Sequence, residues 1–293
     1  MKVIVWGCGE YGHRIIPQLA QMDSIEVLGY TDSDKNLWGK KIGIFNIFPP
    51  DIIKTIDVEQ IIIAVNDPVH CQSIIDEIKM MGIGNNMIRN AFTDECYFDL
   101  LLDQRIRFIR GYSQWIGLNR IQGDVAECGV FRGDSAKYLN KYFPDRNLFL
   151  CDTFEGFSQE DLQDEIENSS EAFANGRFSD RKFFAGTAVD LVINKMPYPN
   201  KVIIKKGYFP DTMEGVENSF AFVNLDMDLY KPMLEGLRFF WGKVPRGGCI
   251  LLHDYFSTEF QRVKQAVRDF ENELGEIITK VPIGDDCSLA LIR

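Results

Sequence analysis

Short apolar runs alternate with longer amphipathic segments along the chain, the pattern of an α/β protein with largely parallel sheets. In the N-terminal part this pattern predicts strands at Lys2–Trp6, Glu26–Tyr30 and Gln60–Val65, and helices at about His13–Met22 and Val69–Met81. These elements predict a small unit in which strands and helices follow one another in turn.

The C-terminal part repeats the alternation with more strands. Apolar runs predict parallel strands near Val125, Leu148, Val202, Phe222 and Ile250. A helix over about Thr258–Leu274 follows, and then two further strands, Glu276–Pro282 and Ser288–Ile292. The turn Gly284-Asp285-Asp286 between these strands predicts an antiparallel hairpin.

We therefore expect two Rossmann-like units, an N-terminal domain over residues 1–90 and a C-terminal domain over residues 122–293. Apolar residues at near-helical spacing predict a helical linker over residues 91–121, starting near Asp94. Between Gly156 and Gly186 the chain is polar and acidic, and we interpret this segment as a helical lid over a substrate. The alternative is a solvated insertion.

Composition narrows the class of protein. The chain has 293 residues and a net charge of −11, which argues against nucleic acid and anionic membrane surfaces as partners. No run of about twenty apolar residues occurs, so no membrane span is expected. The seven cysteines cannot all pair, and Cys8, Cys128, Cys151, Cys249 and Cys287 lack metal-ligand spacing. Reduced, mostly buried thiols and a cytoplasmic location are expected.

The N-terminal unit contains a glycine motif of the dinucleotide-binding type. Gly7, Gly9 and Gly12 form a GxGxxG sequence between the first strand and the first helix, and Asp32 follows the second strand. This arrangement indicates nucleotide binding, with phosphate at the helix N-terminus. Tyr11 could instead fill the phosphate space, and the unit would then bind nothing and only contact a partner.

A second turn of similar kind begins the C-terminal unit. A short strand ends at Glu127, Gly129 and Gly133 lie in the following turn, and the next strand ends at Asp152. In nucleoside-binding α/β folds an acid at the second strand end contacts the ribose. A structural turn and a ligand-binding turn are equally compatible with this sequence.

Acidic residues also end two later strands of the C-terminal unit. Asp226 and Asp228 follow one apolar run, and His253 and Asp254 follow the next. Ligands of open α/β sheets bind outside the carboxyl ends of the strands, and carboxylates from two such ends can hold one hard cation. An Asp at this position can also simply cap a helix. Asp228 is the weaker candidate, because its i+2 position would turn it elsewhere.

Five motifs in this order resemble the macrocin O-methyltransferase family over about Arg105–Arg293. They are Glu127-Cys-Gly-Val-Phe-Arg-Gly, Asp152-Thr-Phe-Glu-Gly-Phe, Gly207-Tyr-Phe-Pro-Asp-Thr, Asp226-Met-Asp-Leu-Tyr and Gly247-Gly with His253-Asp-Tyr. The resemblance implies a class I methyltransferase sheet, which is doubly wound and ends in an antiparallel hairpin. It also implies S-adenosylmethionine as cofactor, Mg²⁺ as metal, and a sugar hydroxyl as acceptor.

The resemblance also implies roles for individual residues. The expected cofactor-binding residues are Glu127, Gly129, Gly133, Asp152, Thr153 and Phe154. The expected catalytic and metal-binding residues are Asp226, His253 and Asp254, with Asp228 as a weaker metal ligand. The family commonly has two adjacent acids where this chain has His253-Asp254, so His253 is open as a ligand, a base or a structural residue.

The N-terminal unit resembles the nucleotide-sugar-binding N-terminal domain of some bacterial sugar acetyltransferases, in the stretches VIVWGCGEYG, TDSDKNLWGKKI and IIIAVND. We therefore expect an S-adenosylmethionine-dependent O-methyltransferase acting on a sugar or nucleotide-sugar, with a homo-oligomer left open. The alternatives are a NAD-dependent oxidoreductase using Gly7, Gly9 and Gly12, and a non-catalytic nucleotide-sugar-binding protein. The oxidoreductase lacks a Tyr-x-x-x-Lys pair in its unit.

Overall fold

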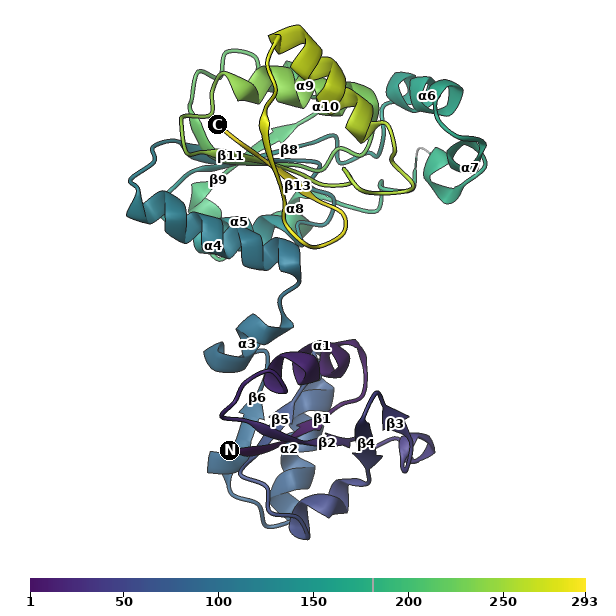
Figure 1. Ribbon diagram of the computed structural model, residues 1–293, viewed down its shortest axis with the longest axis vertical. Coiled ribbons are helices and arrows are strands. Elements are labelled where there is room, and N and C mark those ends of the chain that lie inside the picture. The colour runs from purple at the N-terminus through teal and green to yellow at the C-terminus, as the bar shows by residue number, and fades with distance from the viewer. Residues whose placement is uncertain (181) are drawn as a thin grey trace. The chain divides into compact units, whose positions relative to one another are not determined.

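The computed structural model describes residues 1–180 and 182–293. The chain forms two compact units, Met1–Leu102 and Asp103–Arg293, and each is an α/β unit with its own sheet (Figure 1). No helix among the described residues is long and apolar enough to cross a membrane.

The first unit is built on a six-stranded sheet with the order β3-β4-β2-β1-β5-β6. All neighbouring pairs are parallel except β3 and β4. Its strands are β1 Lys2–Trp6, β2 Glu26–Thr31, β3 Lys41–Ile42, β4 Phe45–Phe48, β5 Gln60–Ile63 and β6 Ile88–Asn90. Its helices are α1 Glu10–Leu19, α2 Pro68–Met80 and α3 Glu95–Leu101, with 3₁₀ turns at Lys35–Leu37, Pro50–Lys54 and Asn85–Met87.

Strand alternation divides the core of the first unit into two layers. Val3 and Val5 of β1 face the cluster that includes α1 and α3, whereas Ile4 and Trp6 face the cluster that includes α2. Because both faces of the sheet are covered, its central strands are apolar throughout, as the sequence pattern predicts.

The second unit is built on a seven-stranded sheet with the order β12-β13-β11-β10-β7-β8-β9. Its strands are β7 Asp124–Cys128, β8 Leu148–Asp152, β9 Val202–Lys206, β10 Phe220–Leu225, β11 Cys249–Leu252, β12 Thr279–Pro282 and β13 Leu289–Ile292. Its helices are α4 Gln104–Leu118, α5 Ala136–Tyr142, α6 Gln159–Asn168, α7 Glu171–Ala174, α8 Val189–Ile193, α9 Tyr230–Trp241 and α10 Val263–Leu274, with 3₁₀ turns at Arg177–Ser179, Pro199–Lys201 and Asp211–Met213.

The topology of this second sheet confirms the expected methyltransferase-like arrangement. Strands β9, β8, β7, β10 and β11 are parallel, and β13 runs antiparallel to both β11 and β12. Strand order reverses between β7 and β10, which is the position where open α/β sheets bind ligands at the carboxyl ends of their strands.

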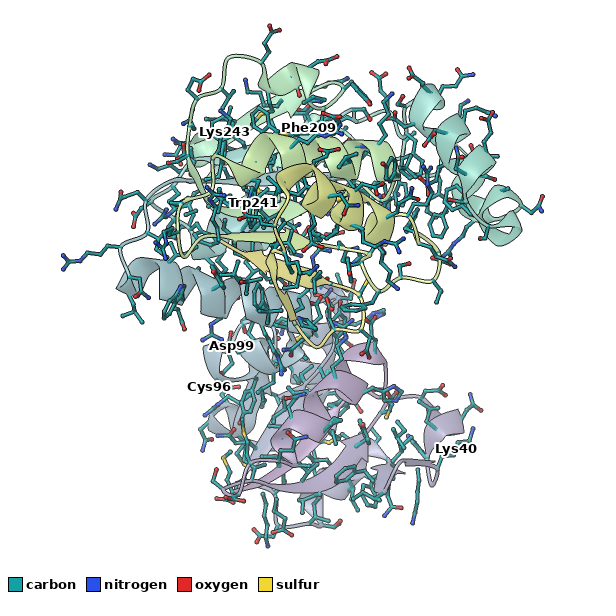
Figure 2. All side chains as sticks on the ribbon, turned by 45° about the horizontal axis from the view of Figure 1, so that its top comes forward. Lys40, Cys96, Asp99, Phe209, Trp241 and Lys243 are labelled. Carbon is teal, nitrogen blue, oxygen red and sulfur yellow. The ribbon has the colours of Figure 1, made fainter. Side chains whose placement is uncertain are left out.

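Aromatic packing fills the face of this sheet that α9 and α10 cover. Phe209 stacks on Phe240 with ring centroids 5.8 Å apart, and Trp241 meets Phe270 edge-on with ring centroids 6.2 Å apart. Figure 2 labels Phe209 and Trp241. Helices α4 and α5 cover the opposite face (Figure 1). On that face the ring centroids of Tyr112 in α4 and Phe222 in β10 lie 5.8 Å apart. The sheet is therefore buried on both sides.

Several helix bounds differ from the sequence expectation. The segment from Asp94 onward is divided into α3 and α4, because the Asp103 side chain accepts a hydrogen bond from the Ile106 N–H and starts a new helix. Helix α1 begins earlier than expected, with Gly9 as its N-cap. Helix α10 begins later, because the Ser257 hydroxyl accepts bonds from two N–H groups in a preceding turn.

The acidic segment after Gly156 is helical and is attached to the unit by buried polar contacts. Glu165 of α6 is 1 % exposed and accepts hydrogen bonds from the Tyr230 N–H at 3.1 Å and from Arg262 at 3.2 Å. Leu162 on the same helix belongs to the core cluster. The alternative of a solvated insertion is therefore wrong for α6.

Candidate active site

The carboxyl ends of β10 and β11 bring three carboxylates together. Asp226 follows β10 directly, Asp228 lies two residues later, and Asp254 follows β11 after one residue. The two strands are parallel neighbours, so their ends meet at one edge of the sheet. One carboxylate oxygen from each residue lies within 4.8 Å of the others. Three carboxylates at this spacing form a donor set suited to a hard divalent cation.

The backbone of this cluster is strained. Asp228 and Asp254 have φ angles of 62° and 59°, in the left-handed region. Asp visits this region more readily than most residues, and such conformations concentrate at functional sites. The left-handed turn explains why the i+2 position of Asp228 does not carry its carboxylate away from Asp226.

Two cationic side chains face these carboxylates. His253 Nδ1 lies 3.0 Å from Asp226 Oδ1 and 2.6 Å from Asp254 Oδ2, and Arg105 Nη2 donates to Asp226 Oδ2 at 2.7 Å. Burial lowers the pKa of His253, but the carboxylates of Asp226 and Asp254 outweigh it and raise the pKa to about 12. The ring is therefore an imidazolium at neutral pH.

The carboxylates respond to this charge in opposite directions. Burial raises the pKa of Asp226, but Arg105 and His253 outweigh it and hold that pKa well below its ordinary value. Burial, and then the charges of Asp226 and Asp254, raise the pKa of Asp228 well above its ordinary value. Arg105 and His253 thus favour the charged form of Asp226, whereas burial and the neighbouring carboxylates disfavour the charged form of Asp228.

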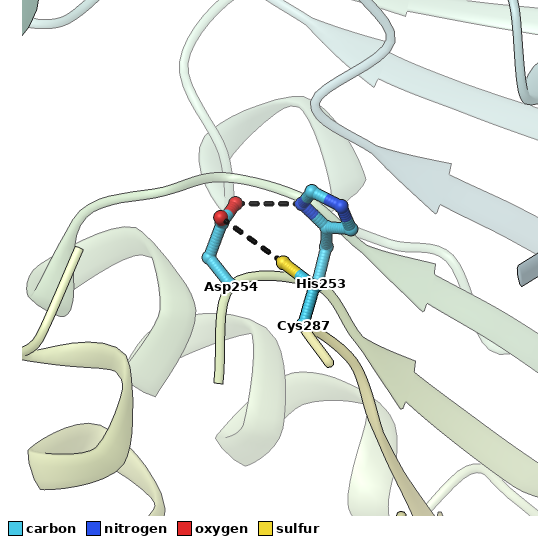
Figure 3. A group of neighbouring side chains, drawn as sticks. All are labelled: His253, Asp254 and Cys287. Carbon is cyan, nitrogen blue, oxygen red and sulfur yellow. Dashed lines mark hydrogen bonds and ion pairs between the residues drawn. The ribbon is translucent and has the colours of Figure 1, made fainter. Parts of the chain in front are cut away.

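Cys287 lies at the side of the same cluster. Its Sγ donates to Asp254 Oδ1 at 3.5 Å (Figure 3). The sequence shows no metal-ligand spacing around Cys287. Strands β11 and β13 are antiparallel neighbours, so the fold brings Cys287, which precedes β13, close to the residues that follow β11.

Behind the carboxylates, a buried polar network links β7 to β10. Glu127 is 0 % exposed, and its Oε1 accepts from Ser135 Oγ at 2.5 Å and from Asn224 Nδ2 at 2.6 Å. Among the described residues, Glu127 Oε2 and Asn224 Oδ1 have no hydrogen-bond partner. Burial raises the pKa of Glu127 to about 7. Ser135 is the N-cap residue of α5, but its hydroxyl bonds Glu127 and makes no capping hydrogen bond to the helix.

The glycines of the turn after β7 permit close packing within the protein. A Cβ atom on Gly129 would lie 1.9 Å from the Asp226 carbonyl oxygen, and one on Gly133 would lie 3.0 Å from Val192 Cγ1. Both glycines have positive φ angles, 83° and 74°. Gly129 therefore allows the turn after β7 to contact the segment that carries Asp226.

Asp152 at the end of β8 holds the neighbouring turns together. Its Oδ2 accepts from the Val130 and Phe131 N–H groups at 2.7 and 2.9 Å, and its Oδ1 accepts from the Phe154 N–H at 2.6 Å. Thr153 Oγ1 donates to the Gly156 carbonyl within the same turn. The structure thus places Asp152, Thr153 and Phe154 in one turn beside the turn after β7.

The first unit repeats this arrangement in its glycine turn. Asp32 Oδ2 accepts from the Cys8 N–H at 2.8 Å. A Cβ on Gly12 would lie 2.0 Å from the Gly7 carbonyl oxygen, whereas a Cβ on Gly9 would meet nothing within 4 Å. Gly12 therefore serves helix packing, and Gly9 leaves space above the turn.

The Tyr11 side chain contacts Phe92 and Asn66 of the first unit. Its ring meets Phe92 edge-on at 4.8 Å, and its hydroxyl accepts from Asn66 Nδ2 at 3.3 Å. Glu10, at the first position of α1, pairs with Arg14 at 2.6 Å. An acid at this position disfavours a phosphate at the helix N-terminus unless its charge is paired.

A surface pocket of about 420 Å³ is formed by the segment that follows Asp254 in the sequence and by helix α10. It is lined by Tyr255, Phe256, Ser257, Thr258, Gln261, Lys264 and Arg268. Lys264 and Arg268 give this pocket a positive charge, although the chain as a whole is acidic.

A family model that covers most of the second unit identifies the family. The model of the macrocin O-methyltransferases (TylF) matches residues 104–283, more than half of the chain. The chain belongs to the macrocin O-methyltransferase family. The family expected from the sequence is thus confirmed, and it is a family of O-methyltransferases. A second model, described as C2185-like, N-terminal, matches residues 1–89.

Individual relatives agree with the family. One relative is the 8-demethyl-8-(2,3-dimethoxy-alpha-L-rhamnosyl)-tetracenomycin-C 4'-O-methyltransferase from Streptomyces olivaceus. It is 25% identical to this chain over 166 residues, which are 53% of this chain and 60% of that protein. The O-methyltransferase NovP is similar in structure, with a TM-score of 0.55, 21% identity, and coverage of 66% of this chain and 81% of NovP. The calicheamicin methyltransferase CalS11 has a TM-score of 0.51, 14% identity, and coverage of 78% and 87%. The structural likeness shows the fold.

Three site residues of this family member escape sequence reasoning. Arg105 is one of several arginines on α4, and spacing does not single it out. Cys287 reaches the cluster only through strand pairing. Asn224 could have been found, because it is a polar residue inside the apolar run of β10.

Proposed function

We propose that the protein transfers a methyl group from S-adenosylmethionine to a sugar hydroxyl, with Mg²⁺ held by Asp226, Asp254 and Asp228. The convergence of these three carboxylates at the ends of β10 and β11 is the observation that carries the proposal. The relative from Streptomyces olivaceus, whose printed name is that of a methyltransferase for a rhamnosyl compound, supports a sugar acceptor.

The donor chemistry of the cluster fits magnesium. All three side chains offer oxygen, which Mg²⁺ prefers. Burial, and then the neighbouring carboxylates, raise the pKa of Asp228, and a bound cation would offset both effects. When bound, a divalent cation lowers the pKa of a ligated hydroxyl. The protein's own contribution is to orient Asp226 through Arg105 and His253, and to orient Asp254 through His253.

His253 takes the role of an orienting cation in this proposal. Its Nδ1 lies between Asp226 and Asp254, so in this arrangement it donates to both and has no lone pair there for a metal or for a substrate proton. The base and the magnesium-ligand alternatives for His253 would each require this ring to leave its position.

The cofactor would lie over the turns at the ends of β7 and β8. We assign Asp152 to the ribose, since a carboxylate that accepts three N–H groups still has a further lone pair. Thr153 and Phe154 form the wall of that turn, and the turn containing Gly129 and Gly133 borders the amino-acid end. Glu127 lies beneath this turn, and its unpartnered Oε2 suits the ammonium group of the methionine end.

The acceptor would enter through the pocket whose lining begins at Tyr255, one residue after Asp254. Ser257 and Thr258 offer hydroxyl donors, and Lys264 and Arg268 offer positive charge. These groups suit the phosphates of a nucleotide-sugar better than a neutral polysaccharide. We therefore place the acceptor's anionic part against Lys264 and Arg268.

The first unit is proposed to bind a nucleotide or nucleotide-sugar independently of methyl transfer. The open space at Gly9 and the Asp32 carboxylate beside the glycine turn support this assignment.

Calorimetry with S-adenosylmethionine, with and without Mg²⁺, followed by a screen of nucleotide-sugar acceptors tests the proposal. EDTA should abolish turnover and leave cofactor binding largely intact. Asp254→Asn should behave like EDTA treatment, whereas the exposed control Asp190→Asn should behave like the unmodified protein. Methylation at full rate in EDTA would contradict the metal, and transfer to no sugar-containing acceptor would contradict the substrate class.

A further inference from the structure

A second group of metal-type donors adjoins the three carboxylates. A ring nitrogen of His253, an oxygen of Asp254 and Sγ of Cys287 lie within 4.8 Å of one another. Figure 3 shows the three side chains converging, with the Asp254 carboxylate linked to both the imidazole of His253 and the thiol of Cys287. Asp254 belongs to both groups, because it is also one of the three clustered carboxylates.

The position of the thiol is fixed by the hairpin turn. Asp285 Oδ1 accepts from the Cys287 N–H at 3.0 Å, and Asp285 Oδ2 accepts from Ser288 Oγ at 2.6 Å. The Cys287 carbonyl accepts from the Phe256 N–H at 2.9 Å, which ties this turn to the segment after Asp254. The thiol is therefore held at the cluster by the backbone of two joined turns.

The donor set differs in kind from the carboxylate cluster. Nitrogen, oxygen and sulfur donors together suit Zn²⁺ and its thiophilic analogues, whereas Mg²⁺ takes oxygen alone. A tetrahedral zinc site places its donor atoms roughly 3.4–3.6 Å apart. To reach this geometry the three side chains would rotate, and His253 would exchange its hydrogen bonds to Asp226 and Asp254 for the cation. His253 and Cys287 are both partly exposed, so an ion can reach them from solvent.

We propose that His253, Asp254 and Cys287 form a binding site for a thiophilic divalent cation of the Zn²⁺ class, next to the magnesium position and sharing Asp254 with it. On binding, the Cys287 thiol would release its proton to solvent as its sulfur ligates the cation, and His253 would ligate through a ring nitrogen.

Sharing Asp254 gives the site a consequence for catalysis, and this step rests on the proposed function. A carboxylate engaged by zinc is withdrawn from the magnesium position. Zinc should therefore inhibit methyl transfer, and Cys287 sets the sensitivity to zinc.

Titration of the full-length protein with Co²⁺ tests the site without any use of activity. Cobalt bound by a thiolate gives a near-ultraviolet charge-transfer band, which Zn²⁺ should abolish by displacement. Cys287→Ser should remove the band and lower cobalt affinity by more than the roughly 10- to 100-fold that loss of an outer partner causes. Cys287→Ala should do the same. Cys96→Ser is the matched control, because Cys96 is a free and exposed thiol, and it should keep the band.

The outcomes separate this inference from the proposed function. A band that persists in Cys287→Ser, or the absence of any band in the unmodified protein, would overturn the site. For the catalytic consequence, the ratio of methyl-transfer rates with and without Zn²⁺ is compared between Cys287→Ser and Cys96→Ser, and equal ratios would overturn it. If the band is present and no methyl transfer occurs with Mg²⁺, the site stands and the proposed function fails.

Discussion

Arg105 donates from Nη2 to Asp226 Oδ2 at 2.7 Å, which joins the first turn of α4 to the end of β10. Their side chains are 14% and 20% exposed, so the pair is largely shielded from water. Asp226 is also paired with His253. Helix α4, which precedes the second sheet in the chain, thus helps to orient a carboxylate of the candidate active site.

Replacement of Arg105 should therefore affect both stability and turnover. Arg105→Gln leaves a buried carboxylate without its main cation, and the free energy of unfolding should fall by about 2–3 kcal/mol. This loss is smaller than that expected for a fully buried ion pair, because both side chains are partly exposed to water. Turnover should fall about 10- to 100-fold because Asp226 loses its orientation. Denaturant unfolding and steady-state assays measure these effects. The exposed control Arg246→Gln should change neither, and full turnover in a folded Arg105→Gln protein would contradict the positioning role.

Much of the fold could be predicted because buried parallel strands have continuous apolar runs bounded by turns. The bounds of β1 and β11 agree with the runs Lys2–Trp6 and Cys249–Leu252. Helix ends were less predictable, since they depend on individual caps. The Asp103 cap divides a segment whose apolar spacing alone continues, and it assigns α4 to the second unit.

The site was predictable where topology alone brings residues together. Asp226 and Asp254 end neighbouring parallel strands, so their proximity follows from strand order. Arg105 was not predictable, because it reaches Asp226 through helix packing across the sheet face. To predict the place of Cys287, one must know that β13 pairs with β11. The sequence pattern predicts only that β13 forms a hairpin with β12.

Asp152 should affect both the local turns and cofactor affinity. In Asp152→Asn one oxygen becomes an NH₂ group, which cannot accept the Phe154 N–H or a ribose hydroxyl in the same geometry. We expect losses of about 1–3 kcal/mol in the free energy of unfolding and in S-adenosylmethionine binding. Thermal unfolding and calorimetry measure them, with the exposed Asp145→Asn as control. An unchanged dissociation constant in the folded variant would remove Asp152 from the cofactor site.

Glu127 should make stability depend on pH. Burial raises its folded-state pKa to about 7 from an ordinary value of 4.5, so the folded protein retains this proton where the unfolded chain has lost it. The contribution is complete below about pH 4.5 and is lost as pH rises through 7, a change of about 3 kcal/mol. Glu127→Gln cannot titrate. Subtracting its unfolding free energy from that of the unmodified protein should therefore give a difference that falls by this amount between about pH 4 and 8.

The exposed Glu217→Gln variant is the matched control for this measurement. Its unfolding free energy should stay parallel to that of the unmodified protein over the same pH range. If the curve of Glu127→Gln is parallel as well, the raised pKa of Glu127 is wrong.

The glycine turn of the first unit allows a test that separates ligand space from packing. Gly9 has a φ of −77°, which any residue can adopt, and a Cβ there meets nothing within 4 Å. Gly9→Ala should therefore leave unfolding nearly unchanged but obstruct a phosphate above the turn. Gly12→Ala places its Cβ 2.0 Å from the Gly7 carbonyl oxygen and should destabilise the unit by about 1–3 kcal/mol.

NMR titration of the protein with uridine, guanosine and nicotinamide nucleotides should shift resonances around Gly7–Gly12. The nucleotide affinity measured from these shifts should fall at least about tenfold in Gly9→Ala, which corresponds to roughly 1.4 kcal/mol. If no nucleotide at millimolar concentration shifts these resonances in the unmodified protein, the first unit is a structural or interaction module. The acceptor must then be recognised by the second unit alone.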